Sequence, residues 1–144
     1  MLAVLPFGAA AVWAQHRWPA ALTIHALPPA AAVVVGGVLM AAGAALHGWA
    51  LLRVRRAYAE NRLETGGPYA AVRHPIHTAW VFLVLPGIAV CVRSWPLLTL
   101  PPLWYGSLRL FVGTEERALA ARFGEAYTAY RSRAGRVFPR VRRR

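Results

Sequence analysis

The sequence has no lysine, no aspartate and a single cysteine among its 144 residues. One thiol, Cys91, excludes an internal disulfide and a cysteine-based metal site. His16 and His25 lie in a predicted loop without a third ligand nearby, so we expect no metal ion there. Charge is also scarce. Charged residues make up 15% of the chain and apolar residues 58%, more than the core of a soluble domain of this length needs. The excess predicts burial in a membrane.

Long stretches without a glutamate or an arginine indicate where the chain crosses that membrane. Residues 30–52 form a stretch of 23 residues, residues 76–92 one of 17 and residues 94–108 one of 15. The first is long enough for a hydrocarbon core of about 30 Å, whereas the other two need tilt or flanking residues. Residues 1–14 are apolar but reach about 21 Å as a helix, so they form a short span, a re-entrant segment or a truncated helix. The sequence predicts an all-α, polytopic membrane bundle of three to four transmembrane helices.

All seventeen basic residues are arginines, and fourteen of them lie on one side of the predicted spans. Five occur in residues 53–74 and nine in residues 117–144, whereas Arg17 and Arg93 lie in the opposite loops. By the positive-inside rule, residues 53–74 and the C-terminus face the cytoplasm. The net charge of +12 is therefore expected to meet anionic lipid head groups rather than nucleic acid. We predict a multi-pass protein of the cell inner (cytoplasmic) membrane.

The predicted spans carry features of helix packing. In the longest one, Gly37, Ala41 and Ala45 recur every four residues and predict a close contact with another helix. His47 lies near the cytoplasmic end of the same span, where it either hydrogen-bonds a neighbouring helix or belongs to a pocket. Pro86 and the pair at residues 101–102 predict bends in the later spans.

Two short polar segments flank the last two spans on the cytoplasmic side. The sequence Thr65-Gly66-Gly67-Pro68 indicates a turn, and Arg73-His74-Pro75 leads directly into a span. A proline is tolerated in the first turn of a helix, where leading N–H groups lack partners. Arg73 and His74 are thus predicted at a helix N-terminus that favours an anion.

The second polar segment begins after Thr114, a predicted N-cap, with Glu115-Glu116 opening a C-terminal cytoplasmic helix. Glu116 shares a stripe of three- and four-residue spacing with apolar and aromatic residues, namely Leu119, Phe123, Tyr127 and Tyr130. This alignment predicts that one carboxylate faces inward. Arg109, near the end of the last span, either reaches the membrane interface or faces a ligand.

These segments together resemble a known family. The string Leu63-Glu64-Thr65-Gly66-Gly67-Pro68-Tyr69-Ala70-Ala71-Val72-Arg73-His74-Pro75, followed after a helical hairpin by Glu115-Glu116, Leu119, Phe123-Gly124, Tyr127, Tyr130 and Pro139, resembles the isoprenylcysteine carboxyl methyltransferase and phospholipid methyltransferase superfamily. The resemblance covers residues 63–139 and implies an S-adenosylmethionine-dependent methyltransferase with a lipid or lipid-linked acceptor. The C-terminal helix would complete the cofactor site at the cytoplasmic face.

The resemblance also implies roles for individual residues. It places cofactor binding at six residues, Tyr69, Arg73, His74, His77, Glu115 and Glu116. Glu116 and Arg109 are the candidate catalytic residues. His74 and the neighbouring N–H groups would bind the cofactor's carboxylate, and a glutamate its ammonium group. The chain then forms a single membrane domain over residues 1–144. Within it lie N-terminal membrane helices (1–52), a cofactor-binding methyltransferase-like region (53–139) and a basic tail (140–144).

The chain departs from the family pattern at two positions. Many members have tyrosine two residues after the proline and glycine two residues further on, where this chain has His77 and Ala79. Two alternatives therefore stay open. One is a nicotinamide-dependent membrane reductase of the sterol reductase type, a class with a similar Arg-His-Pro region but normally longer chains. The other is a non-catalytic membrane scaffold. The sequence leaves the methyl acceptor and the oligomeric state undetermined.

Overall fold

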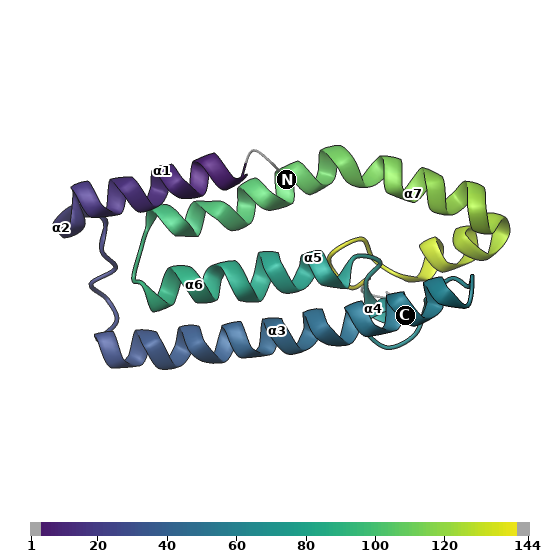
Figure 1. The fold of residues 1–144 in the computed structure, drawn as a ribbon, viewed down its shortest axis with the longest axis horizontal. Helices are drawn as coiled ribbons and strands as arrows, with labels where there is room; N and C mark the ends of the chain where they lie inside the picture. Colours follow the sequence, from purple (N-terminus) through teal and green to yellow (C-terminus); the bar gives the residue numbers. More distant parts are fainter. Residues whose placement is uncertain (1–3, 141–144) are drawn as a thin grey trace.

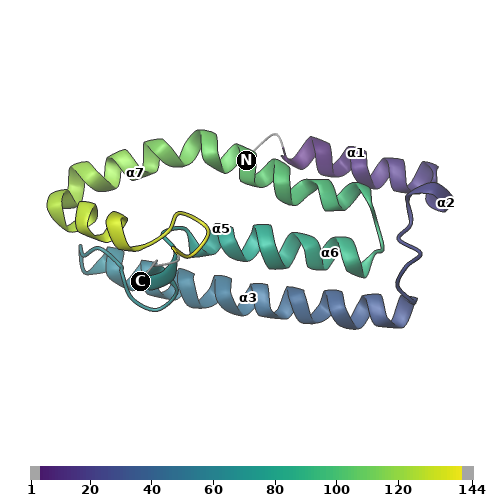
Figure 2. The same ribbon diagram turned by 180° about the vertical axis from the view of Figure 1, so that it is seen from behind.

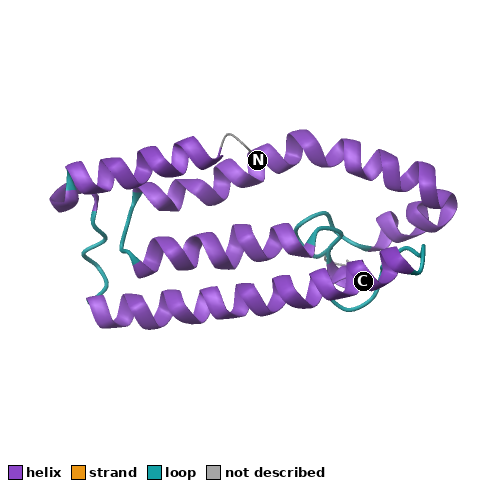
Figure 3. Cartoon of the chain, viewed as in Figure 1, coloured by secondary structure: helices purple, strands orange, loops and turns teal. Residues whose placement is uncertain are grey.

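A computed structural model describes residues 4–140, and their regular structure is helical, as the sequence predicts (Figure 3). The helices are α1 (Val4–Arg17), α2 (Pro19–Leu22), α3 (Pro29–Ala59), α4 (Pro68–Ala71), α5 (Pro75–Ala79), α6 (Leu85–Cys91) and α7 (Leu100–Arg133). A π-helical turn at Trp80–Val84 joins α5 to α6, and a 3₁₀ turn at Pro96–Thr99 precedes α7. Residues 141–144, most of the predicted basic tail, lie outside the described part of the chain.

The long helices run lengthwise beside one another (Figures 1 and 2). The continuous helix from α5 to α6 lies between α3 and α7, and α1 lies along the first part of α7. The chain after α7 folds back toward the start of α5. An isolated antiparallel bridge joins Thr23 to Ser94 at one end of the bundle. A second, parallel bridge joins Val72 to Gly135 beside the start of α5.

Within residues 4–140, α3 is the helix long and apolar enough to cross a membrane, with a mean hydropathy of 2.0. Its outward surface exposes large apolar side chains, including Val34, Val38 and Leu52. The α5–α6 helix is apolar but shorter, and α1 has 14 residues. The longest predicted span is therefore confirmed as a helix of sufficient length.

The packed face of α3 differs from the predicted one. Gly37, Ala41 and Ala45 are exposed, so the prediction of close packing on that stripe is wrong. The buried residues of α3 are instead Ala32, Gly36, Gly43, Ala50 and Ala57. The last four recur every seven residues, so they share one face of α3. A Cβ atom on Gly36 or Gly43 would meet α6 or the π turn, whereas Ala50 packs with Tyr69, Tyr127 and Tyr130 and Ala57 lines a cavity described below.

The prolines also act differently from the sequence prediction. Next to Pro86 the helix contains the π turn, in which the Leu85 N–H bonds the Trp80 carbonyl five residues earlier. A π turn is one way for a helix to accommodate a local disturbance of its hydrogen-bond ladder. Pro101 and Pro102 occupy the first turn of α7, where a missing N–H costs little. The expected bend within a span at this pair is therefore wrong.

The last span and the C-terminal helix form one element, so the prediction of an N-cap at Thr114 is wrong. Helix α7 continues through Gly113 and Thr114, and neither residue interrupts it. The break comes at Gly124, whose φ of 53° and ψ of −125° suit glycine. Glu115 and Glu116 thus lie inside a helix, and the helix dipole does not explain them.

Candidate functional site

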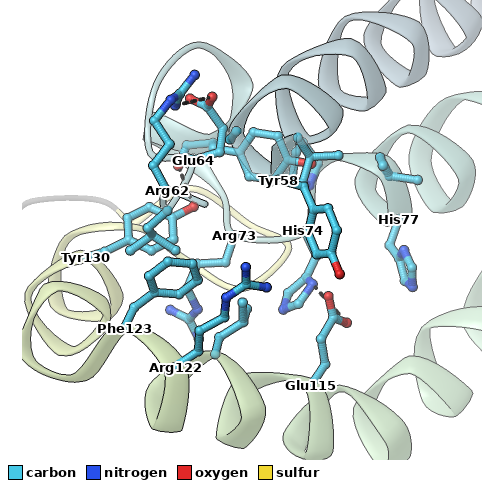
Figure 4. Close-up of a pocket in the computed structure, with 17 residues that line it drawn as sticks. Tyr58, Arg62, Glu64, Arg73, His74, His77, Glu115, Arg122, Phe123 and Tyr130 are labelled. Atoms are coloured by element: carbon cyan, nitrogen blue, oxygen red, sulfur yellow. Dashed lines mark hydrogen bonds and ion pairs between the residues drawn. The ribbon is translucent and has the colours of Figure 1, made fainter. Parts of the chain in front are cut away.

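A cavity of about 370 Å³ lies between the end of α3, the loop before α4, the start of α5 and the middle of α7 (Figure 4). Its volume is in the range of small-molecule sites. Its walls combine aromatic and apolar side chains with groups of both charges. Of the predicted cofactor residues, five line it: Tyr69, Arg73, His74, His77 and Glu115. The resemblance therefore selected residues that the fold brings together.

The inward stripe predicted on α7 forms part of this wall. Glu116, Tyr127 and Tyr130 are buried, and Leu119 and Phe123 line the cavity. The Tyr130 hydroxyl donates to the Tyr69 carbonyl oxygen at 2.8 Å, so the segment after Gly124 is tied to α4. The prediction that one carboxylate faces inward with the aromatic residues is confirmed.

Glu116 is the centre of a buried ion network rather than a free carboxylate. Arg73 Nη2 donates to Glu116 Oε1 at 2.8 Å, and Arg136 Nη2 donates to Oε2 at 2.9 Å. Arg73 also donates to the Ala134 carbonyl oxygen at 2.6 Å, and its side chain is 6% exposed. The side chains of Arg73 and Glu116 are thereby both engaged with other protein groups. Burial alone would raise the pKa of Glu116, but the hydrogen bonds from Arg136 and Arg73 outweigh burial and hold this pKa at about 2.

His74 is buried between the two glutamates. Its Nε2 lies 3.4 Å from Glu116 Oε1, and its Nδ1 lies 3.8 Å from Glu115 Oε2. Burial lowers the pKa of His74 to about 4, which the hydrogen bond to Glu116 opposes in part, so the ring is neutral at pH 7. A neutral imidazole has one N–H donor and one acceptor nitrogen.

The backbone N–H groups beside His74 are not available to an anion. The Arg73 N–H donates to the Gly135 carbonyl oxygen at 2.7 Å, and the His74 N–H donates to the Arg136 carbonyl oxygen at 3.1 Å. These two amides therefore cannot contribute to the expected anion site, because the returning C-terminal segment occupies them. Sequence spacing gives no signal of this pairing across some sixty residues.

Glu115 differs from Glu116 in its surroundings. Its side chain is 59% exposed at the cavity wall. Within residues 4–140, the basic side chain that lies within 4 Å of its carboxylate is the neutral His74 ring. Partial burial and the charge of Glu116 raise the pKa of Glu115. Glu115 and His77 also line a second cavity, of about 150 Å³, on the other side. The two cavities therefore adjoin at this pair of side chains.

The part of the first cavity away from the second one carries charges that the sequence prediction missed. Arg62 Nη1 donates to Glu64 Oε2 at 3.0 Å, and Glu64 is buried. The Arg122 guanidinium lies 5.1 Å from the Tyr58 ring centroid and 5.2 Å from that of Phe123. Figure 4 shows Arg62 and Glu64 apart from Glu115 and His77. Glu64 belongs to the string that carries the resemblance, which was the one available signal for it.

Two predicted pocket residues lie elsewhere, and one has a structural partner. Arg109 is exposed on α7 and lines neither of these cavities, which favours the interface position over the ligand-facing one. His47 Nδ1 accepts a hydrogen bond from Trp80 Nε1 at 3.2 Å, so it joins α3 to the π turn.

Tyr69 lines the cavity while its hydroxyl donates to the Ala50 carbonyl oxygen at 3.4 Å. Burial and the charge of Glu115 raise the pKa of Tyr69 to about 12, so it is a neutral donor.

Comparison with known proteins adds no relative. No protein-family model, curated protein or solved structure matches the chain. The resemblance of residues 63–139 to the methyltransferase superfamily therefore stays a prediction.

Proposed function

We propose that this chain transfers a methyl group from S-adenosylmethionine to a lipid-associated acceptor at the cytoplasmic face of a membrane. The observation that carries the proposal is the pair of cavities that meet at His77 and Glu115. A methyl transfer needs two ligands held end to end, with water excluded between them. One cavity for the donor and one for the acceptor, sharing a wall of two side chains, meets that need.

The first cavity fits the chemical parts of the donor. S-adenosylmethionine has a purine ring, an amino-acid end with both charges, and a methyl group already activated on a sulfonium. The aromatic side chains in the wall suit the purine. Arg122 suits the carboxylate, so the amino-acid end would lie away from the second cavity, whereas Glu64 is already paired with Arg53 and Arg62 and supports the wall. Glu115 then faces the positively charged reacting end.

This arrangement revises the roles implied by the resemblance. Arg73 and Glu116 neutralise each other and fix the returning C-terminal segment, so they support the wall rather than bind the donor. His74 contributes a neutral ring to the wall and holds the two glutamates apart. The side chains proposed to meet the ligands are His74, His77, Glu115 and Arg122.

The membrane placement is part of the same proposal. Helix α3 spans the bilayer, and the α5–α6 helix and the first part of α7 cross beside it as a hairpin. The arginine distribution supports a position of the first cavity at the cytoplasmic surface, where a water-soluble donor arrives. The exposed apolar side chains of α3 and α7 then face lipid.

Equilibrium binding of labelled S-adenosylmethionine to the detergent-purified chain tests this assignment. We expect Arg122→Gln to weaken binding about tenfold, because a charge-assisted hydrogen bond is lost. Arg117→Gln is the matched control, since Arg117 lies on the same helix and lines neither cavity. Unchanged affinity in Arg122→Gln, or binding of a nicotinamide dinucleotide and not of the methyl donor, would refute the assignment.

A further inference from the structure

We infer that the second cavity binds the head group of the methyl acceptor and that this head group is an amine rather than a carboxylate. The inference rests on the proposed function for its role in catalysis. It concerns a site that the resemblance does not assign to any residue of this chain. The charge, the aromatic lining and the opening of the cavity all favour an amine.

The polar groups of the second cavity favour a cation. Among the described residues that line it, the polar ones are His77, Ser107 and Glu115, and none is a lysine or arginine. Glu116 has its charge matched by Arg73 and Arg136, but Glu115 has the neutral His74 as its recorded neighbour. A carboxylate head group would be repelled by Glu115, whereas an ammonium group would be attracted. Charge complementarity therefore selects an amine.

An aromatic ring in the same wall adds a second reason. Trp104 lines the cavity and is held by stacking on Trp80, with ring centroids 5.7 Å apart and an interplanar angle of 5°. The face of an indole ring attracts ammonium and methylated ammonium groups. A carboxylate gains nothing from that ring face. A tryptophan and a glutamate that has no arginine partner within residues 4–140 together form the elements of an ammonium site.

The size and position of the cavity suit a head group whose tail lies outside. Its volume of about 150 Å³ is below that of a site for a whole small molecule. The apolar side of the lining includes Phe111, which is 67% exposed, and the adjacent Leu110 is 80% exposed. The cavity thus opens beside the apolar outer surface of α7. An acyl or prenyl tail can lie along that surface while the amine occupies the cavity.

The chemistry of an amine acceptor balances with the groups present. The bound ammonium first loses one proton, which the His77 imidazole can accept. The nitrogen lone pair then forms the new N–C bond, and the pair of the broken S–C bond stays on the sulfur. The product is a methylated ammonium and a neutral thioether. A carboxylate acceptor would need no such proton acceptor.

Two probes with the same tail and opposite head charges test the inference without the methyl donor. Dodecylamine and dodecanoate are titrated at pH 7.5 into the full chain in neutral detergent, and binding is followed by tryptophan fluorescence. We expect dodecylamine to bind about fivefold more tightly, the size of a partly exposed charge pair. Glu115→Gln should abolish the difference. Glu125→Gln, an exposed glutamate of the same helix that lines neither cavity, should keep it.

The outcomes separate this inference from the proposed function. Equal binding of the two probes, tighter binding of dodecanoate, or a preference that survives in Glu115→Gln would overturn the amine assignment. Helical circular dichroism and a single gel-filtration peak establish that each variant is folded. Loss of S-adenosylmethionine binding with the amine preference intact would instead overturn the proposed function and leave the amine site standing.

Discussion

Arg73 and Glu116 are 43 residues apart in the sequence, and their buried ion pair joins the start of α5 to the middle of α7. Such a pair contributes little net stability over an apolar contact, but removing one partner leaves the other charge buried and unpaired. Arg136 extends the pair to the returning C-terminal segment. These three side chains therefore hold the wall on which the candidate ligand-binding residues stand.

Replacement of Glu116 by glutamine should be costly for this reason. We expect Glu116→Gln to lower the free energy of unfolding by about 3 kcal/mol, because Arg73 keeps its charge in a buried position. Thermal unfolding in detergent measures the change. Glu125→Gln makes the same chemical change at an exposed position and should leave the stability within about 0.5 kcal/mol. A Glu116→Gln variant as stable as Glu125→Gln would contradict the network.

His74 should make the stability of the chain depend on mild acid. Its folded-state pKa of about 4 lies below its ordinary value of 6.5, so the unfolded chain binds a proton first as the pH falls. The stabilisation is fully present above pH 6.5 and is lost as the pH falls from 6.5 toward 4. Glu116, with a pKa held at about 2, adds a further loss below about pH 4.5.

Melting temperatures in detergent between pH 7.5 and pH 4.5 check this expectation. The unsubstituted chain should lose stability through that range, on the order of 2 kcal/mol. His74→Gln should flatten the loss, and His25→Gln, an exposed histidine, should retain it. A melting temperature that does not change with pH in the unsubstituted chain would show that His74 is not held neutral.

The sequence could identify some site residues but not their division of labour. The stripe that contains Glu116 is a local pattern, and it faces inward as predicted, with Leu119, Phe123 and Tyr130 at the cavity. Arg136 pairs with Glu116 because the chain reverses after α7, and no local pattern encodes that contact. For this reason the sequence could not show which of two adjacent glutamates was neutralised.

At the scale of helices, α3 and α6 touch at glycines. A Cβ atom on Gly36 would lie 2.6 Å from the Gly87 carbonyl oxygen, and one on Gly87 would lie 2.9 Å from the Gly36 carbonyl oxygen. These contacts are to backbone atoms, so a methyl group there forces the helices apart. The sequence contains many small residues in α3, but it does not show which of the neighbouring Gly36 and Gly37 faces another helix. That depends on where the partner helix lies.

Gly36 and Gly37 form a matched pair for testing this contact. We expect Gly36→Ala to destabilise the chain by about 2 kcal/mol through overpacking. Gly37→Ala should be neutral or stabilise by up to about 1 kcal/mol, since its Cβ would have nothing within 4 Å and alanine favours a helix. Thermal unfolding of both variants measures the two changes in stability. If Gly37→Ala were the more destabilising variant, the packed face would be the stripe of Gly37, Ala41 and Ala45.

The whole molecule carries its charges asymmetrically, and the proposed multi-pass topology depends on that asymmetry. In a Cys91→Ala background, Ala26→Cys and Ser132→Cys each introduce an exposed thiol on opposite sides of the proposed spans. We expect a membrane-impermeant maleimide to label Ala26→Cys in intact cells. Ser132→Cys should be labelled after permeabilisation. Labelling of both sites in intact cells would contradict the cytoplasmic placement of the cavities.

The fold class and the position of α3 were predictable because they follow from hydropathy, which is a local property of the chain. The continuation of the last span into the C-terminal helix could not be predicted, because threonine is compatible with a helix N-cap and with a helix interior. This continuity matters for function, since one helix carries Trp104 of the second cavity, Arg122 of the first and Glu115 of both. The two proposed ligands are thereby positioned by a single element.

Methyl transfer in membranes tests the central claim most directly. Membranes that contain the chain, and matched membranes that lack it, are incubated with S-adenosylmethionine labelled on the methyl group and then extracted into lipid and aqueous fractions. We expect label in the lipid fraction in proportion to the amount of chain present. Equal label in both preparations, at donor concentrations that saturate binding, would contradict the proposed function.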